Sequence, residues 1–280
     1  MNKIFVFFLL FVLTLSLSAQ PTSIKVLSYN IRCGYCEDSS DANNWSMRKY
    51  LVAYNIRTHN PDIIGLQEAE IFQVNDLAEM LDEYEWYAVS REDGNEKGES
   101  NAILYKKKRF ELLTKQTLWL SKTPELVSKG WDAAFNRTLA VVKLKDLISS
   151  TELFYFNTHL DHKGEVARTE GSKLILNEVR KYSINYPVFL TGDFNYTSNS
   201  DGYRIITSKL YDAMIISKQK SIGGNITFNG FGKDIQPDNK IDFIFVNDKI
   251  EALNHLIDTT TFNGMYPSDH YPVIAEITLK

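Results

Sequence analysis

Apolar residues recur along this chain with two spacings, and together they predict a mixture of strands and helices. Residues 24–30 alternate apolar and polar side chains, which is typical of a strand. Helical spacing is clearest over 163–182, where apolar side chains share one face and Lys and Glu lie opposite. The same patterns predict helices over 47–56 and 74–81, and strands over 62–66, 86–89, 102–105, 139–144, 153–158, 188–190, 241–246 and 273–279.

The order of these elements narrows the fold class. Helices and strands are mixed, but the middle of the chain holds successive strands without helices between them. That order favours an α/β or α+β fold with mixed sheets over a doubly wound parallel sheet. The sequence has no internal repeat, low-complexity linker or Pro- and Gly-rich boundary, so residues 22–280 are predicted to form one domain.

Residues 1–19 have the pattern of a secretory signal peptide. Lys3 gives a positive start, an apolar run follows over 4–17, and small residues favour cleavage after Ala19. A membrane span needs ~20 apolar residues, which argues against the alternative of an uncleaved anchor. No Cys ends the run to carry a lipid. The mature protein is therefore expected in the periplasm or outside the cell.

Export changes the interpretation of the two cysteines, Cys33 and Cys36. Their spacing is that of a thiol–disulfide exchange motif, but here they follow a strand and enter a polar loop instead of opening a helix. Two thiols alone are also an incomplete zinc site. A small loop-closing disulfide between Cys33 and Cys36, formed in an oxidising compartment, is the favoured interpretation.

Composition and charge limit the possible partners. The chain has 280 residues, of which 44% are hydrophobic and 24% charged, as in ordinary globular proteins. Its 31 Lys and Arg against 35 Asp and Glu give a formal net charge of −4. A dedicated binder of duplex nucleic acid usually carries excess positive charge to neutralise phosphates. Such a binder is disfavoured, whereas an enzyme that holds its substrate briefly is not.

Polar side chains with catalytic chemistry stand where the predicted strands end or begin. Sites in α/β sheets form at strand ends, where each rigid element can deliver one or two groups. Singly, each has an ordinary explanation: Glu68 could pair with a lysine, His159 could be a core histidine, and Asp193 could form a turn. As a set they make a coherent inventory for metal-assisted hydrolysis: Asn30, Glu68, Arg137, His159, Asp193, Asn195, Asp242, Asp269 and His270.

The chain resembles the endonuclease/exonuclease/phosphatase superfamily, the fold of deoxyribonuclease-I-like enzymes, in short motifs that occur in the family's order. These are Ser28–Arg32, Leu66–Glu68, Asn157–Asp161, Gly192–Asn195, Ile241–Ile244 and Ser268–Pro272. Residues 118–137 further resemble a compact bacterial branch of exported members, and distantly the deadenylase-like branch. The resemblance implies two mixed sheets packed face to face with helices outside, a four-layer sandwich.

The same resemblance implies a role for each candidate. Metal binding would fall to Asn30, Glu68 and Asp269, and Arg137 would contact phosphate, although Asn136 and Thr138 beside it depart from the family pattern. Five further residues would be catalytic. Asp193 would orient or deprotonate the attacking water, and Asn195 would hold a phosphate oxygen. His270 would face the phosphate with Asp242 fixing its tautomer, and His159 would lie near the phosphate or leaving group.

A hard cation suits this set of residues. Mg²⁺ takes oxygen ligands and needs only one or two carboxylates, with Mn²⁺ as a possible substitute, whereas zinc would require His or Cys. The protein is therefore expected to be a monomeric phosphodiesterase, nuclease or phosphatase. Two other classes stay open: a binding protein on the same scaffold that has lost catalysis, and a thiol redox protein built on Cys33 and Cys36.

Substrate choice is the least determined feature. A small or single-stranded phosphate ester is favoured over duplex DNA, because no basic stripe accompanies the motifs and Lys106–Arg109 is interpreted as a strand end or turn. Trp119, Trp131 and Phe135 are assigned to the core in preference to a groove wall, and Phe228–Gly232 is expected to border the pocket.

Overall fold

The computed structural model describes residues 23–280, so the predicted signal peptide lies outside the described residues. These residues form two six-stranded sheets. In spatial order the first holds β11 (Ile250–Ile257), β12 (Val273–Leu279), β1 (Ile24–Asn30), β2 (Ile63–Gln67), β4 (Ile103–Lys106) and β3 (Tyr84–Tyr87). The second holds β5 (Phe110–Trp119), β6 (Thr138–Asp146), β7 (Glu152–His159), β8 (Val188–Asp193), β10 (Asp242–Val246) and β9 (Tyr211–Asp212).

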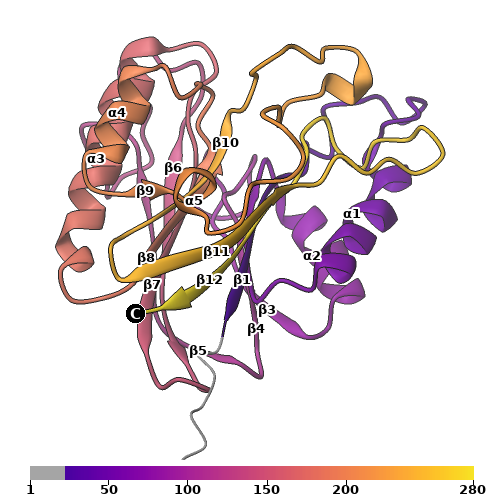
Figure 1. The fold of residues 1–280 in the computed structure, drawn as a ribbon. Coiled ribbons are helices and arrows are strands. Elements are labelled where there is room, and N and C mark those ends of the chain that lie inside the picture. Colours follow the sequence, from indigo (N-terminus) through magenta and orange to yellow (C-terminus); the bar gives the residue numbers. More distant parts are fainter. Residues whose placement is uncertain (1–22) are drawn as a thin grey trace, which may run out of the picture.

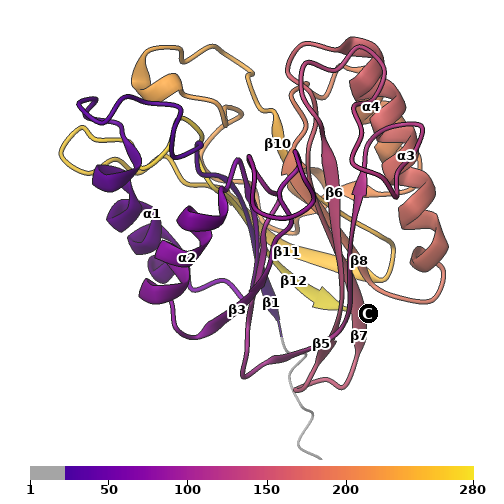
Figure 2. The same ribbon diagram turned by 180° about the vertical axis from the view of Figure 1, so that it is seen from behind.

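The sheets pack face to face, and helices cover both outer faces (Figures 1 and 2). Helices α1 (Trp45–His59) and α2 (Ile71–Met80) cover the first sheet, whereas α3 (Glu165–Ser183) and α4 (Asp201–Thr207) cover the second. A short α5 (Ala213–Ile216) and a 3₁₀ turn (Gly230–Gly232) complete the elements. One apolar core fills the space between the sheets and one lies under each helical layer, which confirms the predicted four-layer α/β sandwich with mixed sheets.

Local sequence signals explain where two of the helices begin or end. Helix α1 ends at Asn60, whose left-handed φ of 48° closes the helix just before Pro61. Helix α2 begins at a capping box, in which Glu70 and Gln73 bond each other's backbone N–H groups. No helix within residues 23–280 is long and apolar enough to cross a bilayer.

Two long strands, β5 and β11, were not predicted. Each lies at the edge of its sheet and pairs with one neighbour only. The middle of β5 exposes Thr114, Lys115 and Gln116, because an edge strand does not need two apolar faces. Polar side chains therefore hide the alternation on which strand prediction depends.

Functional side chains gather at one edge of the two sheets. Strands β1 and β2 run in parallel toward this edge, as do β7 and β8. Strands β4, β6, β10 and β12 are antiparallel to these neighbours, so each of them begins at the same edge. The Asn30 amide at the end of β1 donates to Asp193 at the end of β8 (2.9 Å), so both sheets meet there. We call this the site edge.

A buried amide, Asn157, ties the two sheets together beneath the site edge. Its Nδ2 donates to the carbonyls of Leu66 (2.8 Å) and Ala102 (2.9 Å), and its Oδ1 accepts from Gln67 (2.7 Å) and Thr191 (3.1 Å). Every donor and acceptor position of the amide is thereby used.

Replacing Asn157 by Leu is expected to lower the free energy of unfolding by at least ~2 kcal/mol, because several buried polar groups lose their partner at once. Urea unfolding followed by circular dichroism measures the change. The same substitution at exposed Asn185 is the control and is expected to change stability by less than ~0.5 kcal/mol. Equal stability of the two variants would contradict a structural role for this amide.

Candidate active site

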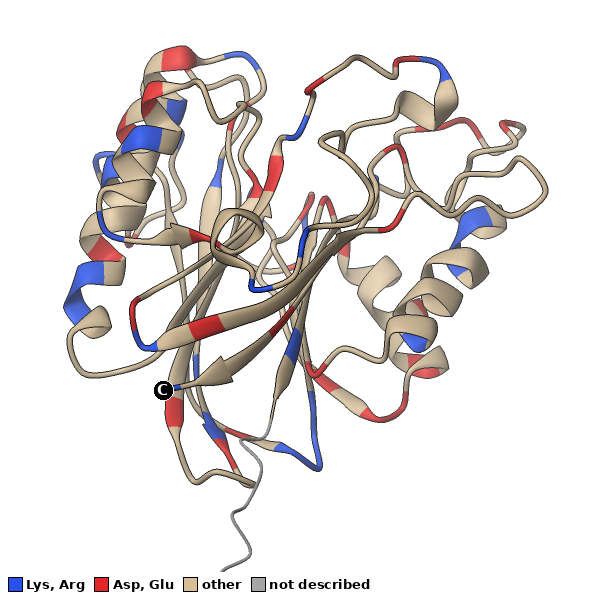
Figure 3. Ribbon diagram, in the orientation of Figure 1, with Lys and Arg blue, Asp and Glu red and all other residues tan. Residues whose placement is uncertain are grey.

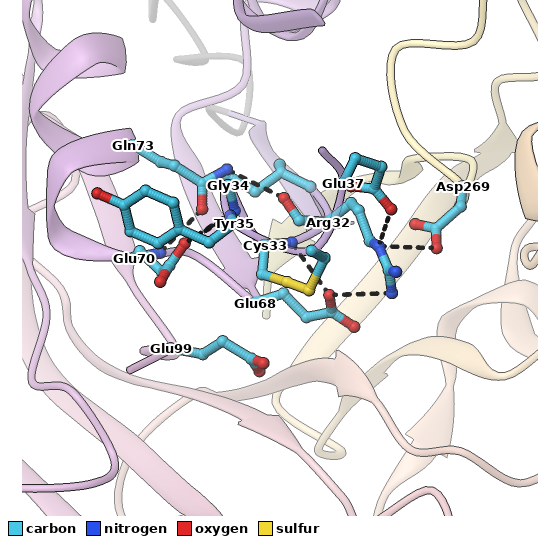
Figure 4. The surroundings of a disulfide bond; sticks show 12 residues. Arg32, Cys33, Gly34, Tyr35, Glu37, Glu68, Glu70, Gln73, Glu99 and Asp269 are labelled. Carbon is cyan, nitrogen blue, oxygen red and sulfur yellow. Dashed lines mark hydrogen bonds and ion pairs between the residues drawn. A yellow bond between two sulfur atoms is a disulfide. The ribbon is translucent and has the colours of Figure 1, made fainter. Parts of the chain in front are cut away.

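Two carboxylates from separate segments converge at the site edge. Glu68 directly follows β2 and has a left-handed φ of 58°, which turns the side chain out of the sheet direction. Asp269 lies in the loop before β12. The Arg32 guanidinium contacts Glu68 Oε2 (3.8 Å) and Asp269 Oδ2 (3.7 Å), which shows that both carboxylates face one place where positive charge is favoured (Figure 4).

The environment of these two carboxylates acts on them in opposite ways. Burial alone would raise the pKa of Glu68, but Arg32, His270 and hydrogen bonds outweigh it and hold that pKa below its usual value. Burial raises the pKa of Asp269, and Glu68 adds to this effect. Asp269 thus resists ionisation beside the charged Glu68. An additional cation at this place would stabilise the ionised form of both acids.

His270 is held between two aspartates. Its Nδ1 lies 2.9 Å from Asp242 Oδ2, and its Nε2 lies 3.7 Å from Asp193 Oδ2. Burial alone would lower the pKa of His270. The negative charges of Asp242 and Asp193 outweigh burial and raise this pKa to about 10. The ring is therefore protonated at neutral pH, and Phe228 packs against it edge-on at 5.1 Å between ring centroids.

Asp193 is buried at the junction of the two sheets. Its Oδ1 accepts from the backbone of Asn195 (2.9 Å), and its Oδ2 accepts from the Asn30 amide (2.9 Å). Burial and the Asp242 charge raise the pKa of Asp193 to about 7, against the opposing effect of His270. A carboxylate with a raised pKa is a stronger proton acceptor than an ordinary aspartate.

Asn30 presents its NH₂ group to the site. Its oxygen accepts from the backbone N–H of Arg32 (3.0 Å), which fixes the amide orientation because that N–H can only donate. The NH₂ group donates to Glu68 (3.1 Å) and Asp193 (2.9 Å). In this geometry Asn30 is a donor that joins the two acids, and its predicted role in holding the metal stays a prediction.

His159 and Asn195 form a further pair at the ends of β7 and β8. Asn195 Nδ2 donates to the Leu160 carbonyl (3.0 Å) and to His159 Nε2 (3.0 Å). Burial and neighbouring cations hold the pKa of His159 well below its usual value, so the ring is neutral. With Nε2 accepting, the proton lies on Nδ1, which is buried and has no hydrogen-bond partner. Both amide hydrogens of Asn195 are thus engaged, and its predicted contact with phosphate stays a prediction.

Arg137 lies just before β6 and is buried. Its Nε donates to Asp161 (3.1 Å), and its Nη2 lies 3.1 Å from His162 Nδ1. Its Nη1 is buried without a hydrogen-bond partner and the residue lines the pocket. An unpaired guanidinium N–H at that place is suited to an anionic oxygen.

The predicted residues share one cavity of about 430 Å³. Glu68, Arg137, His159, Asp193, Asn195, Asp269 and His270 line it, while Asn30 and Asp242 lie behind that lining. Phe228 borders the cavity as expected. The assignment of Phe135 to the core is wrong, since 46% of its surface is exposed at the cavity, whereas Trp119 is buried.

Four further ionisable residues line this cavity that were not among the predicted site residues: Arg32, Arg91, Glu99 and His162. Burial and the Glu68 charge raise the pKa of Glu99 to about 7, although the positive charge of Arg91 acts in the opposite direction. Glu99 Oε2 lies 3.9 Å from His159 Nδ1. Because Glu99 lies shortly before β4, which begins at the site edge, the strand-end rule could have placed it.

The Cys33–Cys36 disulfide is formed and closes the loop beside Glu68 (Figure 4). Consecutive backbone N–H groups of this loop point at acids: Cys33 donates to Glu68 (3.1 Å), and Gly34 donates to Glu70 (2.9 Å). Loop shape and Glu68 position are thereby coupled. In this structure neither sulfur is a free thiol.

Replacing both cysteines by serine is expected to lower the free energy of unfolding by no more than about 2 kcal/mol, the loop-closure value for so short a ring. Activity is expected to fall more clearly, because the Cys33 N–H that holds Glu68 becomes mobile. Hydrolysis rates with and without dithiothreitol measure this. The wild type should lose activity on reduction and the double variant should be indifferent; equal sensitivity of both would contradict the coupling.

The residues present fit a hard divalent cation. Glu68 and Asp269 converge on one cationic group, and their donors are carboxylate oxygens, which Mg²⁺ and Mn²⁺ prefer. Among the described residues, Asp193, Asp242 and His270 also bring possible ligand atoms within 4.8 Å of one another. The disulfide removes Cys33 and Cys36 as thiolate ligands, so the donor set does not favour zinc.

Acids and imidazoles gathered at one edge of a two-sheet sandwich are groups suited to acid–base chemistry on an ester. The model of the endonuclease/exonuclease/phosphatase family matches residues 27–270, and the chain belongs to this family. A solved family protein from Bacteroides thetaiotaomicron has a TM-score of 0.88 and 33% identity, with 93% of this chain and 99% of that chain covered.

Two other proteins of described activity are similar. A mannosyl-6-phosphatase from Bacteroides thetaiotaomicron has a TM-score of 0.86 and 32% identity, covering 91% of this chain and 100% of that one. The 3'-5'-exoribonuclease subunit Ccr4 of the Aspergillus niger CCR4-Not complex is 24% identical, and the match covers 95% of this chain. The match covers 54% of that subunit, so this chain spans about half its length.

Proposed function

We propose that this protein is a divalent-metal-dependent hydrolase of phosphate esters, in which water attacks phosphorus. The observation that carries the proposal is the position of His270, held between Asp242 and Asp193 at the same cavity as the Glu68–Asp269 pair. An imidazolium, a buried base and a convergent pair of carboxylates are the groups that hydrolysis of an anionic ester needs. Relatives described as a phosphatase and an exoribonuclease both act on phosphate esters.

The metal would be held by Glu68 and Asp269, with Asn30 orienting Glu68. When bound, Mg²⁺ or Mn²⁺ supplies charge that stabilises the phosphoryl and leaving oxygens. The chain's own groups do the rest. His270 donates its Nε2–H to a phosphate oxygen, and the bond from Nδ1 to Asp242 keeps the ring oriented and charged.

Asp193 is the base in this proposal. Its raised pKa allows it to take a proton from water, and the Asn30 amide and Asn195 backbone keep the carboxylate in place as it does so. Arg137 Nη1, which has no partner, would hold a phosphate oxygen. His159 stands beside Asn195 with a free Nδ1–H that can donate to the ester or leaving oxygen.

Hydrolysis by the purified protein tests the proposal. The substrates are a bis-aryl phosphodiester, an aryl phosphate monoester, single- and double-stranded nucleic acid, phosphoinositols and sphingomyelin, each with Mg²⁺, Mn²⁺ or EDTA. At least one ester should be hydrolysed with Mg²⁺ or Mn²⁺ and not with EDTA. If none is hydrolysed under any condition, the chain is better explained as a binding protein on this scaffold.

We also propose that the protein is exported and acts as a monomer. The formed Cys33–Cys36 disulfide supports export, because such bonds persist in oxidising compartments. Sequencing the amino terminus of the protein recovered from the periplasm or medium should give a start at Gln20, and light scattering should give the mass of one chain. A full-length chain retained in the cell would contradict export.

A further inference from the structure

The cavity continues beyond the reacting groups to a wall that the proposed mechanism does not use. Residues 90–100 form an arm between β3 and β4, closed by backbone bonds such as Arg91 N–H to Glu99 O (2.9 Å). The Trp119 indole donates to the Arg91 carbonyl (2.8 Å), which fixes the arm against the end of β5. Arg91, Glu99 and Phe135 present this wall to the cavity.

Arg91 is fixed from several sides. Its Nη1 and Nη2 donate to the two oxygens of Glu99 at 2.6 and 3.0 Å, and its Nε donates to Glu92 (3.2 Å). Its guanidinium carbon lies 4.8 Å from the centre of the Phe135 ring. A buried guanidinium held by a two-point carboxylate pair and an aromatic ring is pre-organised, so it loses little freedom when it binds a ligand.

This wall lies on the side of the cavity where the leaving group of the ester would be. Glu99 Oε2 lies 3.9 Å from His159 Nδ1, so the Arg91–Glu99 pair begins one side chain beyond His159. Figure 4 shows the Glu99 carboxylate pointing into the space beneath Glu68. An ester whose phosphate lies between His270 and Arg137 would extend its alcohol portion past His159 to this pair.

Charge at the cavity favours a substrate with one phosphate. Arg32 is paired with Glu37 and approaches Glu68 and Asp269, and Arg91 is paired with Glu99. Figure 3 shows Lys and Arg interspersed with Asp and Glu along the described chain. A nucleic-acid strand needs several unpaired cationic side chains along its path. Arg32 and Arg91 are already paired with carboxylates.

The chemistry of the pair favours hydroxyl groups. Each Glu99 oxygen accepts one bond from Arg91 and keeps capacity for a second, and the guanidinium has hydrogens left to donate. A hydroxyl group both donates and accepts, so neighbouring hydroxyls match a carboxylate–guanidinium pair, whereas an ionised phosphate only accepts and has no hydrogen to donate to Glu99.

We propose that Arg91, Glu99 and Phe135 form a specificity site for the alcohol side of a hydroxylated phosphate monoester, such as a sugar or polyol phosphate. This inference rests on the proposed function. Arg91 and Phe135 select the substrate and take no part in the chemical step. Arg91 contacts the hydroxyl groups, Glu99 fixes Arg91 and shares those contacts, and Phe135 supports the guanidinium.

The test compares kcat/KM for hexose 6-phosphates of differing hydroxyl stereochemistry with kcat/KM for n-hexyl phosphate, which lacks the hydroxyls. Wild-type protein should prefer at least one hexose phosphate by at least ~10-fold, because polar groups of the site stay unpaired with the alkyl ester. In Arg91→Met this selectivity ratio should fall at least ~10-fold. In Phe135→Ala, where the residue is 46% exposed, it should fall in the same direction.

Arg204→Met is the matched control, since Arg204 is an exposed arginine on α4, and its ratio should equal that of the wild type. Methyl glycoside 6-phosphates, included beside the free sugars, distinguish the phosphorylated end of a glycan from a free sugar phosphate. An unchanged ratio in both Arg91→Met and Phe135→Ala, no preference in the wild type, or faster cleavage of a single-stranded oligonucleotide would overturn the inference. Hydrolysis of the bis-aryl diester alone would overturn it and leave the proposed function intact; hydrolysis of nothing would overturn both.

Discussion

Replacing Asp193 by asparagine is expected to lower kcat at least ~10²-fold while leaving the fold intact. Asparagine has nearly the same shape, but it cannot take a proton from water, and its amide would face the donors that now serve the carboxylate, Asn30 and the Asn195 backbone. Steady-state hydrolysis of the best ester from the substrate panel measures kcat, and circular dichroism with thermal unfolding verifies the fold.

Asp201→Asn is the matched control for this change. Asp201 begins α4, and its side chain is 75% exposed, so the same loss of charge occurs far from the buried acids. Its kcat should stay within about twofold of the wild type, as expected for a surface substitution without a catalytic partner. A kcat for Asp193→Asn near that of the control would remove Asp193 from the role of base.

Replacing Glu68 by glutamine is expected to lower kcat/KM by on the order of 10²-fold or more at limiting Mg²⁺. The amide keeps one oxygen but loses the charge that, together with Asp269, defines the cationic position beside Arg32. A second measurement does not depend on turnover. Saturating Mg²⁺ or Mn²⁺ should raise the thermal midpoint of the wild type and leave that of Glu68→Gln nearly unchanged.

Glu37→Gln separates metal binding from general electrostatics. Glu37 also pairs with Arg32, at 2.9 Å, but it is not one of the two convergent carboxylates. This variant should keep the thermal response to Mg²⁺. If Glu68→Gln keeps that response too, or if neither protein nor variant responds to Mg²⁺ or Mn²⁺, then Glu68 does not hold the metal.

Much of the site was predictable because strand direction places its residues. A residue at the end of β8 and a residue at the start of β10 must lie together when these strands are antiparallel, and Asp193 does pair in register with Asp242. The same rule places His159 beside Asp193 through the parallel pair β7–β8. Short motifs at strand ends therefore carried information about three-dimensional proximity.

Other features had no comparable signal in the sequence. The orientation of the Asn30 amide depends on a backbone bond from Arg32, whose left-handed φ of 60° local residue preferences do not predict. Arg91 reaches the cavity because an irregular arm folds back on itself and docks on Trp119. Phe135 was assigned to the core because phenylalanine is usually buried, but it is 46% exposed and lies beside the guanidinium groups of Arg91 and Arg137.

Sheet direction also decides how this protein can be handled. Because β1 leaves the edge opposite the site and β12 ends there, with Ile24 paired to Ile277, Ser23 and Lys280 both lie away from the cavity (Figure 1). Attachment of the carboxyl terminus to a resin, a sensor surface or a carrier protein should therefore leave the cavity open to dissolved esters. An immobilised form should turn over small substrates at nearly the rate of the free protein.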